Sequence, residues 1–180
     1  MTENPWFCKY SYVKLFTRHY TRYKTNQLGL NRRPHCGMDS SEPNKPASDS
    51  KKGKELVFIV DDWPLLAELA DTLLQDEGYE TRSFQDPVEA LKAIEESNLR
   101  PELLITDGVM SPLNGLELID KCRQHLPHLK TILVSGTFEE SFLNGQPIKP
   151  DRFLGKPYES DILIGIVREL LDQEPPAAKN

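Results

Sequence analysis

The feature that most constrains the fold of this chain is a series of short, mostly apolar runs, each followed by charged or hydroxyl-bearing residues. Four such runs occur, in chain order Leu56–Val60 before Asp61 and Asp62, Leu103–Thr106 before Asp107, Thr131–Val134 before Ser135, and Arg152–Gly155 before Lys156. Short apolar runs are typical of parallel strands that helices cover on both sides. Open sheets of this kind bind their ligands beyond the carboxyl ends of the strands. The sequence therefore predicts that the residues after these runs converge on one site.

Amphipathic helical segments separate the predicted strands. The first predicted helix runs from Pro64 to a stop at Gly78, with Leu65, Leu66, Leu69, Leu73 and Leu74 at helical spacing. A strand over Tyr79–Phe84 follows, and then a helix that Asp86 caps and that has Pro87 at its first position. Two further helices are expected over Gly115–His125 and Ser160–Leu171. In the helix after Asp86, we expect Val88, Leu91 and Ile94 to form the buried face. Glycine and prolines leave room only for a short helix around Phe138–Asn144. Five strands alternating with five helices predict an α/β fold, a doubly wound parallel sheet with helices on both faces.

The distribution of charge predicts how the chain is divided. Residues 1–54 hold eleven Lys and Arg against four Asp and Glu, a net charge of +7, whereas residues 55–180 carry a net charge of −13. The stretch before residue 55 is rich in Ser, Pro, Asn and Lys and nearly devoid of apolar residues, which is typical of a linker. We therefore expect an N-terminal extension at 1–37, a flexible linker at 38–54, a folded domain at 55–172 and a tail at 173–180.

The predicted extension is both basic and aromatic. Its aromatic and basic residues alternate, in the order Trp6, Phe7, Lys9, Tyr10, Tyr12, Lys14, Phe16, Arg18, Tyr20, Arg22, Tyr23 and Lys24. Such a segment could serve as an arm that binds single-stranded nucleic acid or a membrane surface. We favour a different interpretation, in which natural translation starts at Met38 and residues 1–37 are an upstream extension, because no recognisable motif accompanies the pattern. Nucleic-acid binding is the less favoured alternative.

Several classes of protein are disfavoured by simple features of the sequence. No apolar run approaches the ~18–20 residues needed to span a bilayer, and the N-terminus lacks the apolar core of a secretory signal. The three cysteines are an odd number without a Cys-x-x-Cys spacing, which argues against a disulfide framework. We expect a cytoplasmic protein.

The residues after the strands suggest phosphoryl chemistry. Asp61, Asp62 and Asp107 would repel one another unless a cation neutralised them, and carboxylate oxygens are the ligands that Mg²⁺ prefers. A carboxylate beside such an ion can attack phosphorus and form an aspartyl phosphate. Lys156 and the hydroxyl of Ser135 could then bind the phosphoryl oxygens. Each residue alone is more often a turn, a helix cap or a solvated side chain, but such residues at four strand ends, in this order, favour a site.

The order Asp61-Asp62, Asp107, Ser135 and Lys156-Pro157 resembles the receiver domain of two-component response regulators, and the resemblance extends over residues 55–172. It implies a flavodoxin-like fold with strand order 2-1-3-4-5. It also implies that Asp107 accepts a phosphoryl group from a phosphohistidine, carried by a sensor histidine kinase or a histidine phosphotransfer protein.

The resemblance implies roles for the surrounding residues as well. Asp61, Asp62, Asp107 and the backbone carbonyl of Val109 would hold Mg²⁺, with Asp61 acting through water. Lys156 and Ser135 would contact the phosphoryl group, and Phe153 stands at the position of the aromatic switch residue. Simple core packing is the alternative for Phe153.

Two departures from the family pattern bear on function. The proline of Met110-Ser111-Pro112 comes one place later than usual, although Gly115 keeps its place eight residues after Asp107. The proline-interrupted segment 137–150 resembles the receivers of hybrid histidine kinases.

We expect a stand-alone, CheY-like receiver that switches partner binding or relays phosphate, because only a short tail follows residue 172. A phosphorylation-independent adaptor with the same fold is an alternative. A phosphohydrolase is disfavoured, because Val109 occupies the place of the second acid that such enzymes carry.

Overall fold

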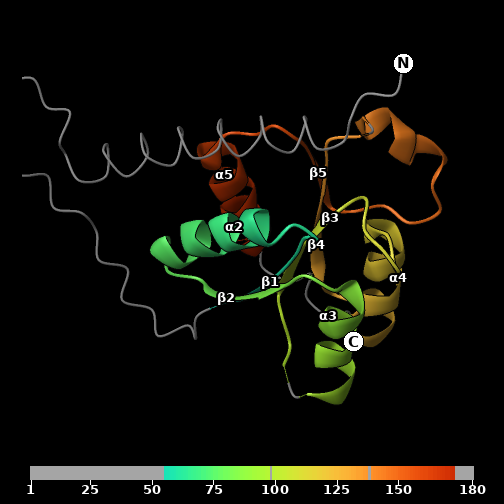
Figure 1. Ribbon diagram of the computed structural model, residues 1–180, viewed down its shortest axis with the longest axis horizontal. Coiled ribbons are helices and arrows are strands. Elements are labelled where there is room, and N and C mark those ends of the chain that lie inside the picture. The colour runs from blue at the N-terminus through green and yellow to red at the C-terminus, as the bar shows by residue number, and fades with distance from the viewer. Residues whose placement is uncertain (1–54, 98, 138, 173–180) are drawn as a thin grey trace, which may run out of the picture.

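A five-stranded parallel sheet forms the centre of the protein in the computed structural model, which describes residues 55–97, 99–137 and 139–172 (Figure 1). The strands are β1 (Leu56–Val60), β2 (Glu80–Phe84), β3 (Leu103–Asp107), β4 (Lys130–Ser135) and β5 (Arg152–Gly155). Their spatial order is β2-β1-β3-β4-β5, and every neighbouring pair is parallel. The predicted fold and strand order are therefore confirmed. The predicted extension, linker and tail lie outside the described residues.

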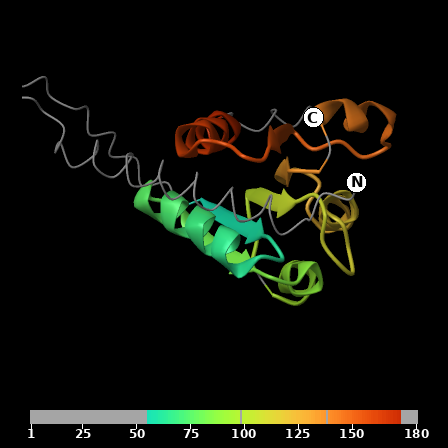
Figure 2. The ribbon, with the colours of Figure 1, turned by 45° about the horizontal axis from the view of Figure 1, so that its top comes forward.

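Helices cover both faces of this sheet, as Figure 2 shows. Helices α2 (Pro64–Asp76) and α5 (Ser160–Leu171) pack on one face, and α3 (Pro87–Glu96) and α4 (Gly115–His125) pack on the other. Successive side chains of a strand point to opposite faces, so Val57 and Ile59 join the α2–α5 core while Phe58 and Val60 join the α3–α4 core. This double burial is the reason why β1, β3 and β4 are so strongly apolar.

The first two helices differ in detail from the predicted pattern of buried residues. In α3 the Asp86 cap is confirmed, because its carboxylate accepts a hydrogen bond from the Val88 amide at 2.8 Å. The predicted buried face of α3 was partly wrong, since Pro87, Ala90 and Ile94 are buried whereas Val88 and Leu91 are half-buried. Small side chains complete the inner face of α2 too, where Ala67 and Ala70 are buried and Leu65 is 40% exposed. Alanine carries too weak an apolar signal to mark a buried face by itself.

The segment between β4 and β5 is the least regular part of the described domain. The predicted helix around Phe138–Asn144 is a 3₁₀ helix, η1 (Glu140–Gly145), and residue 138 lies outside the described residues. Pro147 follows two residues after the end of η1 and supplies no backbone N–H, so the turn does not continue. The described part of the chain accordingly holds four α-helices and this one 3₁₀ helix.

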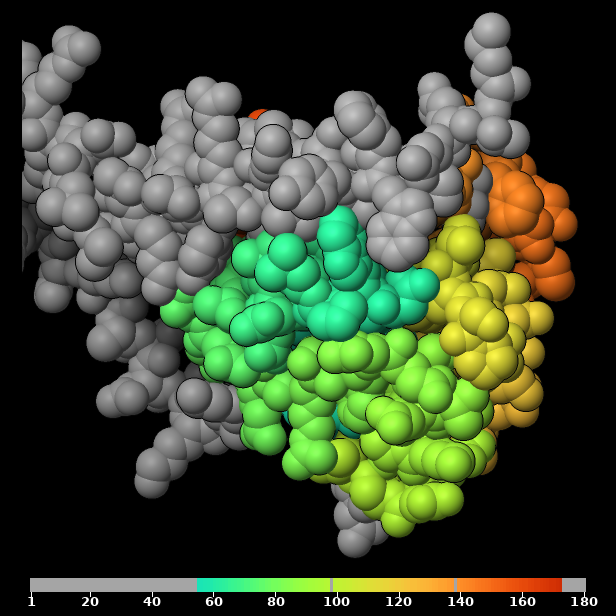
Figure 3. Space-filling model, viewed as in Figure 1, coloured from blue at the N-terminus to red at the C-terminus, as the bar shows by residue number. Residues whose placement is uncertain are grey.

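On the surface, α2, α3 and the loop after β3 adjoin one another, as the space-filling view of Figure 3 shows. Within the described residues, no helix combines the length and the apolar character required to cross a membrane.

Candidate functional site at the carboxyl edge of the sheet

Hydrogen bonds beyond the strand ends fix the backbone of the predicted site residues. Past the end of β1, the amide of Asp61 donates to the Phe84 carbonyl at 3.1 Å. The amides of Gly108 and Lys156 donate to the carbonyls of Val134 and Ser135, each at 2.7 Å. Parallel pairing thus continues past the regular strands, and the carboxyl ends of β1, β3, β4 and β5 meet at one edge.

Lys156 joins two of the three predicted acids in one ionic cluster. Its ammonium Nζ lies 2.8 Å from Asp61 Oδ2 and 2.8 Å from Asp107 Oδ1. The three side chains are only 11%, 10% and 7% exposed, in the order Lys156, Asp61, Asp107. Screening by water is weak at this depth, so the contacts hold the ammonium firmly between the carboxylates.

The buried charges shift the pKa values of two of these groups. Burial raises the pKa of the Asp61 carboxyl above its usual value, the negative charge of Asp107 adds to that rise, and the ammonium of Lys156 opposes it. Burial alone would lower the pKa of Lys156, but Asp61 and Asp107 outweigh burial and hold that pKa above its usual value. The Lys156 side chain is therefore charged at neutral pH.

Asp62 adds a third carboxylate to the cluster. One oxygen from each of Asp61, Asp62 and Asp107 can be chosen so that all lie within 4.8 Å of one another, with Asp62 exposed at the mouth of the site. Among these four side chains, three acids stand beside one lysine. Such a set of hard oxygen donors, open to solvent on one side, fits Mg²⁺, which keeps several of its waters when a protein binds it.

Ser135 lies beside this cluster, but its hydroxyl contacts another residue. The Oγ of Ser135 is 3.2 Å from Thr137 Oγ1 and also accepts a hydrogen bond from the Thr137 amide at 3.2 Å. The Ser135 side chain is buried at the end of β4, whereas Thr137 is exposed. Sequence reasoning predicted the position of Ser135 and missed this local partner.

Val109 and Phe153 occupy different surroundings. Val109 follows the buried turn at Gly108, and its side chain is 51% exposed. Phe153 is half-buried on β5 and packs against the α3–α4 core. Core packing and a switching role remain compatible for Phe153, and the roles of both residues remain predictions.

Gly115 contributes to the site in a way that sequence reasoning missed. A Cβ atom at this position would lie 2.3 Å from the backbone oxygen of Asp107 and 2.6 Å from Leu133 Cδ1. The first turn of α4 therefore presses directly against the backbone of the candidate nucleophile. Its spacing from Asp107 was visible in the sequence, but no local signal indicated the contact.

Comparison with known proteins identifies the family. The sequence profile described as the response regulator receiver domain matches residues 57–168. The chain therefore belongs to the receiver-domain family of two-component signal transduction.

The chain matches one part of longer curated proteins. The sensor kinase CckA of Brucella abortus is 30% identical over 123 residues, which cover 68% of this chain and 13% of that protein. The DNA-binding response regulator MtrA of Mycolicibacterium smegmatis is 29% identical over 126 residues, which cover 69% of this chain and 54% of that protein. The chain thus matches only part of the length of these relatives.

Solved structures agree with this assignment. A CheY-like receiver from Methanospirillum hungatei matches with a TM-score of 0.59 and 28% identity, over 66% of this chain and 94% of that one. The response regulator TrrA of Thermotoga maritima, solved in complex with Mg²⁺-BeF, matches with a TM-score of 0.56 and 30% identity, over 64% of this chain and 98% of that one.

Proposed function

We propose that this receiver accepts a phosphoryl group on Asp107 in phosphorelay signalling. The observation that carries the proposal is the buried contact of Lys156 with both Asp61 and Asp107, at 2.8 Å each, in a cluster of three acids and one lysine. A structural ion pair needs no third acid, whereas a site for a cation and a phosphoryl group does. The phosphoryl donor would be a phosphohistidine of a sensor histidine kinase or of a histidine phosphotransfer protein.

In the proposed reaction, a carboxylate oxygen of Asp107 attacks the phosphorus atom of the phosphohistidine. The P–O bond to Asp107 forms as the P–N bond to the imidazole breaks, and the imidazole nitrogen leaves with the bonding electron pair. The ammonium of Lys156 is positioned to neutralise charge on the phosphoryl oxygens. Asp61, Asp62, Asp107 and the carbonyl of Val109 would hold Mg²⁺, which would supply further positive charge to those oxygens. The protein is a phosphoacceptor in this proposal, with at most self-catalysed gain and loss of phosphate.

Ser135 and Phe153 are proposed to convert the phosphoryl group into a change of surface. The hydroxyl of Ser135 would exchange its contact with Thr137 for a phosphoryl oxygen. Phe153, two residues ahead of Gly155 on β5, would then move inward. Phosphorylation in this account alters the binding of a partner protein by the receiver itself, in the cytoplasm.

Phosphate uptake from a small donor tests the proposal. The full chain is incubated with acetyl phosphate and Mg²⁺, and acid-labile phosphate is measured for the wild type, Asp107→Asn and the surface control Asp161→Asn. We expect uptake by the wild type and the control, and its loss in Asp107→Asn or when EDTA replaces Mg²⁺. If the folded wild type takes up no phosphate, a phosphorylation-independent adaptor becomes the better account.

A further inference from the structure

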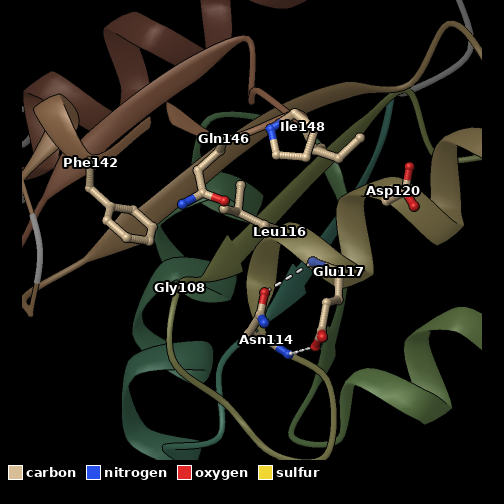
Figure 4. Close-up of a pocket in the computed structure, with 9 residues that line it drawn as sticks. Gly108, Asn114, Leu116, Glu117, Asp120, Phe142, Gln146 and Ile148 are labelled. Atoms are coloured by element: carbon tan, nitrogen blue, oxygen red, sulfur yellow. Dashed lines mark hydrogen bonds between the residues drawn. The ribbon is translucent and has the colours of Figure 1, made fainter. Parts of the chain in front are cut away.

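A groove separates α4 from the η1–β5 segment (Figure 4). Its volume is about 440 Å³. The described residues that line it are Gly108, Asn114, Leu116, Glu117, Asp120, Phe142, Gln146, Pro147 and Ile148. Leu116 lies in its centre in the close-up, and the ring of Phe142 projects into the open space beside Leu116. The side chain of Phe142 is 48% exposed.

The groove is acidic as well as apolar. Glu117 and Asp120 are both charged residues of α4 that line it, and its described lining includes no Lys or Arg. The folded domain as a whole, residues 55–172, carries a net charge of −13. A ligand matched to this groove would therefore combine bulky apolar groups with positive charge.

The walls of the groove are held in place before any ligand binds. At the start of α4, Asn114 and Glu117 form a reciprocal capping box with hydrogen bonds of 2.9 and 3.0 Å. The opposite wall is tied to α4 by Arg123, a residue of α4 that donates a hydrogen bond to the carbonyl of Lys149, directly after Ile148, at 2.7 Å. A preformed groove binds with less loss of conformational entropy than one that must be ordered.

The chain itself carries a segment with the required chemistry. Residues 1–37 hold seven Lys and Arg against one acidic residue, a net charge of +6, and seven aromatic residues interleave with them. We propose that, in the chain that starts at Met1, this segment docks in the α4–η1 groove of its own chain, with aromatic side chains against Leu116 and Phe142 and basic side chains beside Glu117 and Asp120.

The length of chain between the segment and the domain permits such a contact. Residues 38–54 can span up to about 60 Å when fully extended, at about 3.5 Å per residue. A domain of this size has a radius of gyration of only about 13 Å, so every face lies within reach. A tether of this kind raises the effective concentration of the segment to roughly the millimolar range, so a weak contact suffices for docking.

Docking would allow residues 1–37 to regulate the access of partner proteins to the surface beside Asp107. The groove includes Gly108, the residue directly after Asp107, so a docked segment would cover the surface next to the phosphoacceptor and compete with partner proteins there. This consequence for regulation rests on the proposed function, whereas docking itself does not.

A spin label on the segment tests docking directly in the full chain. Cys8 is labelled with a nitroxide in a Cys36→Ser background, while Cys122 is buried and the pKa of its thiol is raised to about 12 by burial, so it does not react. We expect the amide signals of Leu116, Phe142 and Ile148 to lose most of their intensity relative to the reduced label. Signals at the far side of the sheet, such as Ile162 on α5, should keep theirs.

Two variants and a dilution series complete the test. Asp120→Lys or Phe142→Ser should restore the groove signals at least twofold, and Glu96→Lys, which changes the same charge on α3, should not. Even broadening over the whole domain, or broadening centred on another face, would overturn the proposal. Broadening that disappears on dilution would assign the contact to a second copy and overturn it equally. None of these outcomes depends on phosphate uptake.

Discussion

Two charged clusters anchor the β4–β5 half of this domain, and they differ in their balance of charge. At the carboxyl edge, Lys156 lies between Asp61 and Asp107, with Asp62 within reach. At the other end of the same strands, Arg123 contacts Asp151 at 2.7 Å. The first cluster has three acids for one base, and the second has one of each.

The two clusters also differ in the hydrogen bonds that their acidic residues accept. Asp151 Oδ2 accepts from Arg123 Nη2 at 2.7 Å, from the Thr131 amide at 2.7 Å and from Thr131 Oγ1 at 3.1 Å. This balanced cluster joins α4, β4 and the residue before β5, and Arg123 and Thr131 both donate to the carboxylate of Asp151. In the acidic cluster, two buried carboxylates, those of Asp61 and Asp107, share the one ammonium of Lys156. Surplus buried charge is unfavourable for folding, so its presence indicates a ligand, while a balanced pair indicates a structural role.

Removing the base from each cluster gives the largest expected contrast. Lys156→Met should lower the free energy of unfolding by roughly 3–5 kcal/mol in EDTA, because it leaves Asp61 and Asp107 buried without a counter-charge. Arg123→Met should cost only about 1–2 kcal/mol, because the amide and hydroxyl of Thr131 still donate to Asp151. Urea denaturation with and without Mg²⁺ measures both.

Magnesium should separate the two variants further. We expect Mg²⁺ to restore part of the stability lost in Lys156→Met, since the cation takes over the neutralisation of the acids, and to stabilise Arg123→Met only as much as it stabilises the wild type. An equal response of both variants to Mg²⁺ would break the comparison between the clusters.

The packing of α4 against Asp107 predicts the next effect in size. Gly115→Ala would place a methyl group 2.3 Å from the Asp107 backbone oxygen, so it should destabilise the domain by about 1–3 kcal/mol and slow phosphate uptake. Gly165→Ala on α5 is the matched control, because a Cβ there meets no atom within 4 Å, and it should stabilise the domain by up to about 1 kcal/mol. Thermal unfolding of the two variants decides the matter, and equal effects would show that the contact at Gly115 is unimportant.

The last predicted effect is absent at neutral pH, appears only in alkaline solution and concerns Cys122. Cys122 precedes Arg123 on α4, and burial followed by the charge of Glu95 raises the pKa of its thiol from 9.0 to about 12. The unfolded chain therefore loses this proton at a lower pH than the folded one, so stability should fall as pH rises from 9 towards 12. Each pH unit in that range corresponds to about 1.4 kcal/mol. Cys122→Ala should remove this component from the pH dependence of urea denaturation, and an unchanged slope would contradict the assignment.

Much of the fold could be predicted from the sequence because its signals are local. The lengths of the apolar runs, together with the aspartate and proline at the start of α3, predicted the strands and helices and hence the topology. The charged residues after the strands predicted that Asp61, Asp107 and Lys156 converge. The short η1 was harder to predict, since a 3₁₀ turn and an α-helical turn share the same composition. The buried face of α3 was misjudged because Ala90 resembles a surface residue in the sequence.

The features that sequence reasoning missed depend on contacts between distant residues. Arg123 and Asp151 are separated by 28 positions, and no motif connects them. The contact between Gly115 and the backbone of Asp107 arises from the angle at which α4 meets β3. The link between Ser135 and Thr137 spans only two residues, but the sequence does not determine which group a serine hydroxyl contacts.

The most direct test of the central claim is to locate the phosphoryl group on the chain. After incubation with acetyl phosphate and Mg²⁺, the acyl phosphate is reduced with borohydride, the protein is digested and the modified aspartate is identified by mass spectrometry. We predict a single modified residue, Asp107, which lies against Lys156 at the end of β3. Modification at Asp61 or Asp62 instead, with Asp107 intact, would contradict the assignment of the nucleophile.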